Sequence, residues 1–197
     1  MSSTISVVEY FREITDLLAG KFLVVPSAVG GQYEIKEKGQ TPFSVTPKNL
    51  TNHSCVSLEK GANAATLSVF KVGHRHAHRR ADRLFVTWDA VNSRVVYFAC
   101  ELKSTSTGGA WTQLQVTLAF ARQLDALVRV NRALPHPTVF AAGTVRSMPI
   151  AVKNFAPASF SPLWTKPLKN CPLGICHTQY DRAQSPLRLG DVVASLP

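Results

Sequence analysis

The chain has 197 residues, of which 45% are hydrophobic and only 17% charged, so its composition suits one domain with a sizeable core. Lysine and arginine outnumber aspartate and glutamate by 22 to 12, and the resulting net charge of +10 predicts a polyanionic partner, with nucleic acid the first candidate. No apolar run of about 18 residues and no secretory signal pattern is present, so we expect no membrane span and a cytoplasmic or nuclear protein with reduced cysteines. One of these, Cys100, is expected to be a buried free thiol in a core strand.

The first predicted element is a helix over residues 6–18. Ser6 and Glu9 have the spacing of a capping box, and Gly20 suits the C-terminal cap. The apolar side chains recur at helical spacing as Val7, Tyr10, Phe11, Ile14, Leu17 and Leu18. A short strand over 22–25, an edge strand within 27–38 and a loop over 40–52 are predicted to follow.

A basic stretch precedes the centre of the chain. Residues 57–65 are predicted as a helix or a turn and 65–72 as a strand, after which three histidines alternate and share one face of an extended segment. Their basic surroundings favour a strip that contacts nucleic-acid phosphates, made of Lys71, His74, Arg75, His76, His78, Arg79, Arg80 and Arg83. A solvated loop and a zinc site are the alternatives.

Two apolar, β-branched runs then flank a polar break at residues 92–93, which predicts a β-hairpin. A two-residue turn puts Asp82 opposite Lys103, and a turn shifted by one residue puts it opposite Leu102. Both pairings bring Asp82 close to Glu101 and Lys103, which share one face of their strand. Two carboxylates this close repel unless a cation lies between them, and such oxygen ligands suit Mg²⁺ or Mn²⁺.

The most regular helix is predicted over 111–130. Its core stripe consists of Trp111, Leu114, Leu118, Ala121, Leu124 and Val128. Gln113 lies beside this stripe near the helix start, either facing the end of the Glu101 strand or exposed like an ordinary helix glutamine. A strand over 138–142 is predicted in the same sheet after this crossover helix, followed by an irregular proline-rich tail and a last short helix or strand at 187–196.

The order of Asp82, hairpin, Glu101-Leu102-Lys103 and a helix carrying Gln113 resembles the PD-(D/E)XK nuclease superfamily, although Ala81 replaces the proline of the motif. The resemblance covers roughly residues 55–145. It implies a restriction-endonuclease-like α/β fold with a mixed central sheet flanked by helices. Residues 1–54 would belong to the same domain, 55–146 would form the nuclease core, and 147–197 would be a proline-rich extension packed on that core.

The resemblance also implies a metal-dependent nuclease acting on DNA or RNA phosphodiesters. Asp82, Glu101 and the Leu102 carbonyl would hold Mg²⁺ or Mn²⁺. Lys103 would position the attacking water or stabilise transition-state charge, and Gln113 would bind water or a phosphate oxygen. The family's additional acid would be Glu59, with Glu9 and Glu13 as alternatives and a surface or capping role as the competing interpretation of each.

An endonuclease is favoured over an exonuclease, and a homodimer is one expectation because many relatives dimerise to cut two strands. Two other classes of function remain open from the sequence. The first is a non-catalytic nucleic-acid-binding or scaffold module on the same fold, and the second is a regulatory protein whose basic face docks an acidic protein partner.

Overall fold

The computed structural model describes residues 3–18, 20–28, 30–36, 42–58, 80–103, 109–130, 132–146, 176–181 and 186–196. These residues form an α/β fold whose central sheet has the strand order β4-β5-β6-β8-β9. The strands are β4 (His53–Ser57), β5 (Arg83–Asp89), β6 (Arg94–Lys103), β8 (Thr138–Arg146) and β9 (Cys176–Asp181). The pairs β4–β5 and β5–β6 are antiparallel, whereas β6–β8 and β8–β9 are parallel. The α/β class with a mixed central sheet is therefore confirmed.

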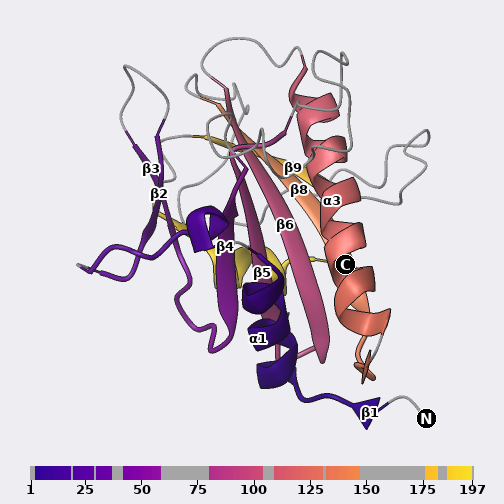
Figure 1. Cartoon of the computed structure of the whole chain (residues 1–197). Helices are drawn as coiled ribbons and strands as arrows, with labels where there is room; N and C mark the ends of the chain where they lie inside the picture. Colours follow the sequence, from indigo (N-terminus) through magenta and orange to yellow (C-terminus); the bar gives the residue numbers. More distant parts are fainter. Residues whose placement is uncertain are drawn as a thin grey trace.

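The central sheet lies between two covering layers (Figure 1). Helices α1 (Val7–Leu17) and α3 (Ala110–Val130) pack on one face. The other face is covered by α4 (Leu189–Ala194) and by a small sheet of β2 (Tyr33–Ile35), β3 (Phe43–Thr46) and β10 (Leu187–Arg188). Alternation along the strands supplies both layers, since successive side chains point to opposite faces. Tyr97 thus joins the core beneath the helices, and Phe98 joins the core beneath the small sheet.

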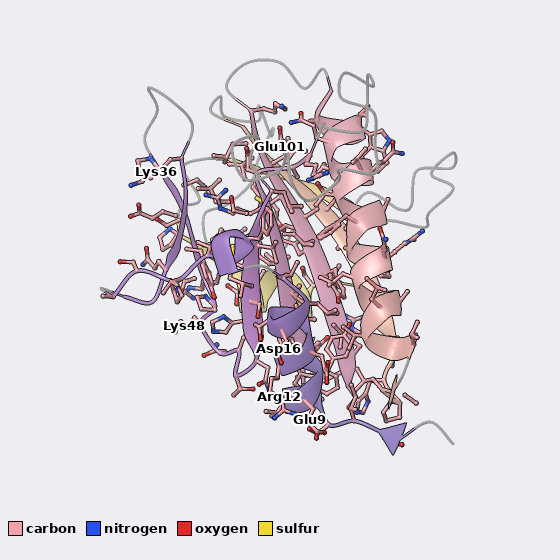
Figure 2. The ribbon with its side chains drawn as sticks, in the orientation of Figure 1. Glu9, Arg12, Asp16, Lys36, Lys48 and Glu101 are labelled. Atoms are coloured by element: carbon pink, nitrogen blue, oxygen red, sulfur yellow. The ribbon has the colours of Figure 1, made fainter. Side chains whose placement is uncertain are left out.

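The N-terminal helix begins where its capping box predicts. The Ser6 main-chain N–H donates to Glu9 Oε2 over 2.8 Å, and the Glu9 N–H donates to Ser6 Oγ over 3.2 Å. Arg12 and Asp16 lie on the exposed face of α1 (Figure 2). The predicted C-cap is wrong, because the helix ends at an extended Leu18 and residue 20 instead starts the short 3-10 helix η1 (Gly20–Phe22).

The remaining short segments agree with the predictions in part. The strand expected over 22–25 is reduced to a single bridge between Leu23 and Val56 that follows η1. The loop expected over 40–52 contains β3, a short strand that buries Phe43 and Val45 on one face. The edge strand within 27–38 is confirmed as β2, and 187–196 forms both β10 and α4. The strand expected over 65–72 lies outside the described residues.

The predicted hairpin is confirmed as β5 and β6, but its register differs by two residues from the two-residue turn and by one residue from the shifted turn. Asp89 pairs with Arg94, so residues 90–93 form a four-residue loop rather than a two-residue turn. The physical reason is the Asp89 carboxylate, which accepts bonds from the Asn92 main chain, the Asn92 side chain and the Arg94 guanidinium inside the loop. Continued past the Arg83–Cys100 pair, this register brings Asp82 level with Glu101 instead of Lys103 or Leu102.

Helix α3 connects β6 to the parallel strand β8, as predicted. Its predicted stripe is buried at Leu114, Leu118, Ala121, Leu124 and Val128, and Trp111 is partly buried. Within the tail that was expected to be irregular, residues 176–181 form β9 of the central sheet, whereas 147–175 and 182–185 lie outside the described residues. Cys100 is a buried free thiol, as predicted. In the described part of the chain, no helix combines the length and apolarity needed to cross a membrane.

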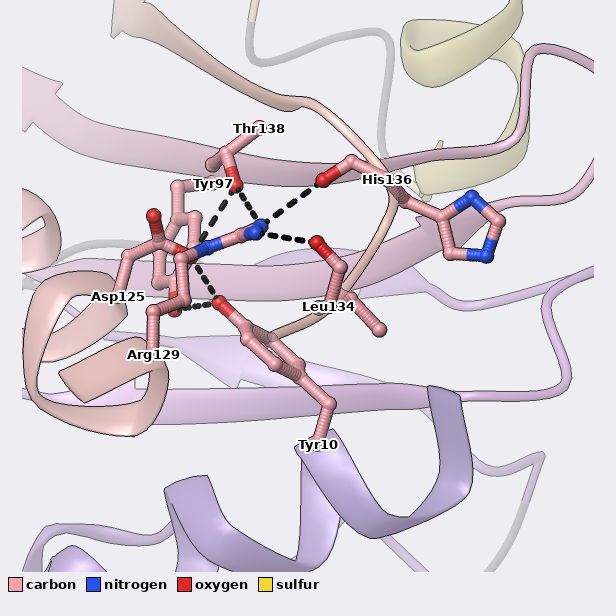
Figure 3. A network of polar contacts seen from close by, with 7 residues as sticks. All are labelled: Tyr10, Tyr97, Asp125, Arg129, Leu134, His136 and Thr138. Carbon is pink, nitrogen blue, oxygen red and sulfur yellow. Dashed lines mark hydrogen bonds and ion pairs between the residues drawn. The ribbon is translucent and has the colours of Figure 1, made fainter. Parts of the chain in front are cut away.

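A polar network fixes the C-terminal half of α3 to the strands (Figure 3). The Arg129 guanidinium donates to Asp125 Oδ1 over 2.9 Å and to the Leu134 and His136 carbonyls over 2.9 and 3.1 Å. It also donates to Thr138 Oγ1 over 2.7 Å, at the first residue of β8. One side chain therefore ties the end of α3 to residues 134, 136 and 138 at the start of β8.

The same network reaches α1 and β6 through two buried tyrosines (Figure 3). The Tyr10 hydroxyl donates to the Asp125 carboxylate, so the Tyr97 hydroxyl, 2.8 Å away, donates to Tyr10. Burial raises the pKa of both hydroxyls, which keeps them protonated donors. Asp125, on α3, is thereby linked to α1 through Tyr10 and to β6 through Tyr97, close to the first residue of β8.

Candidate active site

Two carboxylates meet at the open end of the β5–β6 hairpin. Asp82 immediately precedes β5 and is half-buried, whereas Glu101 lies within β6 and is 2% exposed. The Asp82 main-chain N–H donates to Glu101 Oε2 over 3.1 Å, and the Leu102 N–H donates to Asp82 Oδ2 over 2.7 Å. Each carboxylate is therefore held by the main chain of the opposing segment, which fixes the two acidic groups beside one another.

Lys103 and Gln113 complete the cluster. The Lys103 ammonium lies 2.5 Å from Glu101 Oε1 and donates to Gln113 Oε1 over 2.7 Å. Gln113 lies one turn into α3, and its side-chain amide in turn donates to the Arg80 carbonyl over 3.1 Å. The structure therefore brings Asp82, Glu101, Lys103 and Gln113 together, and Gln113 faces the end of the Glu101 strand rather than solvent.

Burial makes Glu101 an unusual acid. Desolvation and, next, the neighbouring Asp82 raise the pKa of Glu101 to about 7, although Lys103 acts in the opposite direction. At neutral pH this carboxyl is therefore divided between its protonated and ionised forms. A cation bound between the two carboxylates would offset both the cost of burying the Glu101 charge and its repulsion by Asp82, and would favour ionisation of Glu101.

A second side chain of α3 holds the segment before Asp82, and the sequence analysis missed it. The Ala81 main-chain N–H donates to Thr117 Oγ1 over 2.8 Å, and Thr117 is fully buried. Thr117 follows Gln113 by four residues, so the two lie on the same face of the helix. That spacing is the only signal in the sequence that could have identified it.

Arg80 and Arg83, two members of the predicted phosphate-contacting strip, are 7% and 8% exposed. Arg83 Nη1 donates to the Asp82 carbonyl over 2.7 Å and to Ser57 Oγ over 3.1 Å, and burial lowers the pKa of Arg80. Little of either side chain is available to a bound phosphate. Arg83 also lines an open pocket of about 480 Å³ together with Val24, Val25, Ser27, Gln32, Glu34 and Lys36.

Several predicted site residues lie outside the described residues, namely Glu59, Lys71, His74, Arg75, His76, His78 and Arg79. Glu9, an alternative for the additional acid, caps α1 at the opposite end of the sheet from Glu101 (Figure 2). Within the described ranges, no group of three or more His, Cys, Asp or Glu side chains is placed to hold a metal ion. The donors present at the hairpin are thus two carboxylates and the adjoining main-chain carbonyl of Leu102.

No family model, curated protein or solved structure matches this chain in the comparisons made with each.

Proposed function

We propose that the protein is a metal-dependent nuclease that hydrolyses phosphodiester bonds of DNA or RNA. The observation that carries this proposal is the hydrogen-bonded cluster of Asp82, Glu101, Lys103 and Gln113 at the end of one hairpin. Acids of shifted pKa beside a lysine and an amide are typical of catalytic centres, where charge must be stabilised in a defined place.

The donor set fits a hard divalent cation. Asp82 and Glu101 provide carboxylate oxygens and Leu102 a carbonyl oxygen, the ligand types that Mg²⁺ and Mn²⁺ prefer, with water in the remaining positions. The raised pKa of Glu101 supports the fit, because a buried pair of acids binds either a proton or a cation in order to avoid repulsion. When bound, such an ion would acidify water and neutralise charge on a phosphate.

The protein's own side chains would divide the remaining work. Lys103 is 20% exposed at its side chain, so its ammonium can reach solvent or a phosphate oxygen while Gln113 fixes its direction. We propose that Lys103 orients the attacking water or stabilises the charge that the phosphate gains in the transition state. Gln113 holds that ammonium and, through the Arg80 carbonyl, the segment that leads to Asp82.

Two features outside the cluster support the same proposal. The hairpin of β5 and β6, the crossover helix α3 and the parallel strand β8 follow one another in the hairpin–helix–strand order that the proposal expects. The net charge of +10 favours association with a polyanion, with a binding affinity that falls as salt rises. DNA and RNA are polyanions and also carry the phosphodiester bonds that the proposed site would hydrolyse.

The test is cleavage of labelled single- and double-stranded DNA and RNA with Mg²⁺, with Mn²⁺ and with EDTA. Lys103→Ala is expected to lower the cleavage rate by at least about 100-fold, the cost of removing a transition-state charge stabiliser. Lys48→Ala is the matched control, since it removes the same charge from an exposed position away from Glu101 (Figure 2). Full cleavage by Lys103→Ala would refute the proposed role of this lysine.

A calorimetric titration with Mn²⁺ tests the ligands separately from cleavage. Asp82→Asn should weaken Mn²⁺ binding, whereas Asp16→Asn, on the exposed face of α1, should leave it unchanged. Salt-dependent binding of nucleic acid without cleavage, and without any requirement for metal, would instead favour the non-catalytic binding module. Salt-sensitive binding to an acidic protein but not to nucleic acid would favour the regulatory alternative.

A further inference from the structure

The position of Asp82 depends on hydrogen bonds from outside its own strand. β5 begins at Arg83, and residues 80 and 81, just before Asp82, are bonded to side chains of α3. The Arg80 carbonyl accepts from Gln113, and the Ala81 N–H donates to Thr117. Two side chains of one helix therefore hold the two residues that lead directly into the candidate metal ligand.

Thr117 is the less replaceable of these two contacts. Both Thr117 and Ala81 are buried, at 0% and 1% exposure, so water has little access to the Ala81 N–H if the hydroxyl is removed. A buried main-chain donor left without an acceptor is costly, and the segment would be expected to move in order to find another partner. Any such movement displaces Asp82, whose carboxylate is bonded to the Leu102 N–H on the adjacent strand.

We infer that Thr117 is a positioning residue of this site, which acts by holding Ala81 so that the Asp82 carboxylate lies beside Glu101. Its consequence for metal binding and cleavage rests on the proposed function, while its consequence for the geometry of Asp82 does not. Together Gln113 and Thr117 form what we call the α3 clamp. Through these two contacts the position of α3 determines where the segment before Asp82 lies.

The test compares three variants with the wild type. Thr117→Val keeps the shape but removes the hydroxyl, and Thr117→Ser keeps the hydroxyl. Thr87→Val is the matched control, because Thr87 is also fully buried and donates to the Asn52 carbonyl over 3.2 Å, at the other end of β5. This control loses a buried hydroxyl and one hydrogen bond to the main chain, in which Thr87 donates whereas Thr117 accepts, without touching the α3 clamp.

The first measurement is amide hydrogen exchange on the metal-free protein. In Thr117→Val the protection of the Ala81 N–H and of the Leu102 N–H is expected to fall by about tenfold relative to core amides of β6, and Thr117→Ser should restore most of it. A residue that merely supports the fold would not change Leu102 selectively. Unchanged protection at Leu102 in Thr117→Val, or an equal loss in Thr87→Val, would overturn the inference.

The second measurement is Mn²⁺ affinity by calorimetry, with cleavage measured beside it. Thr117→Val should weaken Mn²⁺ binding by about 10- to 100-fold, as loss of a residue that orients a metal ligand does, and Thr117→Ser should recover it. Wild-type affinity in Thr117→Val would contradict the inference. If the wild type binds no Mn²⁺ and cleaves nothing, the proposed function fails, and the exchange of Leu102 still decides whether Thr117 positions Asp82.

Discussion

Replacing Glu101 by glutamine is expected to stabilise the protein at alkaline pH. The pKa of this carboxyl is raised from 4.5 to about 7 in the folded state, so folding favours its protonated form. Below 4.5 the folded and unfolded chains are both protonated and the carboxyl contributes nothing. Above 4.5 the unfolded chain loses its proton first, so the free energy of unfolding falls as pH rises and the loss is complete above about 7.

The magnitude follows from the two pKa values. At about 1.4 kcal/mol for each pKa unit, the difference between 4.5 and about 7 corresponds to about 3 kcal/mol, of which about 2.5 kcal/mol develops between about pH 5 and pH 8. The attraction of Lys103 is already contained in that pKa. Glutamine resembles the protonated acid, and its oxygen can still accept the Asp82 N–H, so Glu101→Gln avoids this pH-dependent loss.

The assay is urea denaturation of the wild type and Glu101→Gln at about pH 5 and about pH 8 without divalent metal. The difference in free energy of unfolding between the two proteins should shift by about 2.5 kcal/mol in favour of the variant at the higher pH. Glu34→Gln, at an exposed carboxyl in β2, should keep the pH dependence of the wild type. If the difference between wild type and Glu101→Gln is the same at both pH values, the reasoning about burial of Glu101 is refuted.

Three further outcomes are expected. Tyr10→Phe removes a buried hydroxyl from the Asp125 network and should lower the free energy of unfolding by about 1–2 kcal/mol in urea; a wild-type midpoint would show that the network contributes no stability. Gly143→Ala should cost about 1–3 kcal/mol in the same assay, because its new methyl would lie 2.6 Å from Phe98 Cζ, and an unchanged midpoint would contradict this. Mg²⁺ at about 100 times its dissociation constant should raise the free energy of unfolding by about 2.7 kcal/mol, an effect that EDTA reverses. At the same Mg²⁺ concentration, that increase should be smaller at about pH 5 than at about pH 8, because protonation of Glu101 competes with the metal at the lower pH. An equal increase at about pH 5 and about pH 8 would count against this carboxylate as a ligand.

The sequence predicts elements well where one local signal determines them. The capping box of Ser6 and Glu9 locates the start of α1, and the apolar stripe of α3 locates its buried face. The hairpin is also predictable from its apolar runs, but its register is not. The four-residue loop is favoured over a two-residue turn by the side chain of Asp89, which accepts bonds from Asn92 and Arg94. These bonds cannot be inferred from residue types alone.

The site is predictable to the same degree as the hairpin. Any register near the correct one brings Asp82 close to Glu101 and Lys103, so these residues are identified although neither predicted register is the observed one. Thr117 could not be identified this way, because its role depends on how α3 docks against the segment before β5. β3 was missed for a related reason, since its four residues are stabilised partly by pairing with β10, which is distant in the sequence, beside the neighbouring strand β2.

The connectivity of the hairpin has a consequence for folding kinetics. Asp82 and Glu101 are 19 residues apart within one local unit, whereas β8 joins β6 only after the chain has closed a loop that contains all of α3. Hairpins form on a scale of about 1–10 μs, and parallel pairing across a helix is slower because more chain entropy must be lost first. We therefore expect the acidic pair to assemble before the α3 clamp reaches it. Substitutions in β5 and β6 should then slow refolding, whereas substitutions at Thr117 should mainly accelerate unfolding.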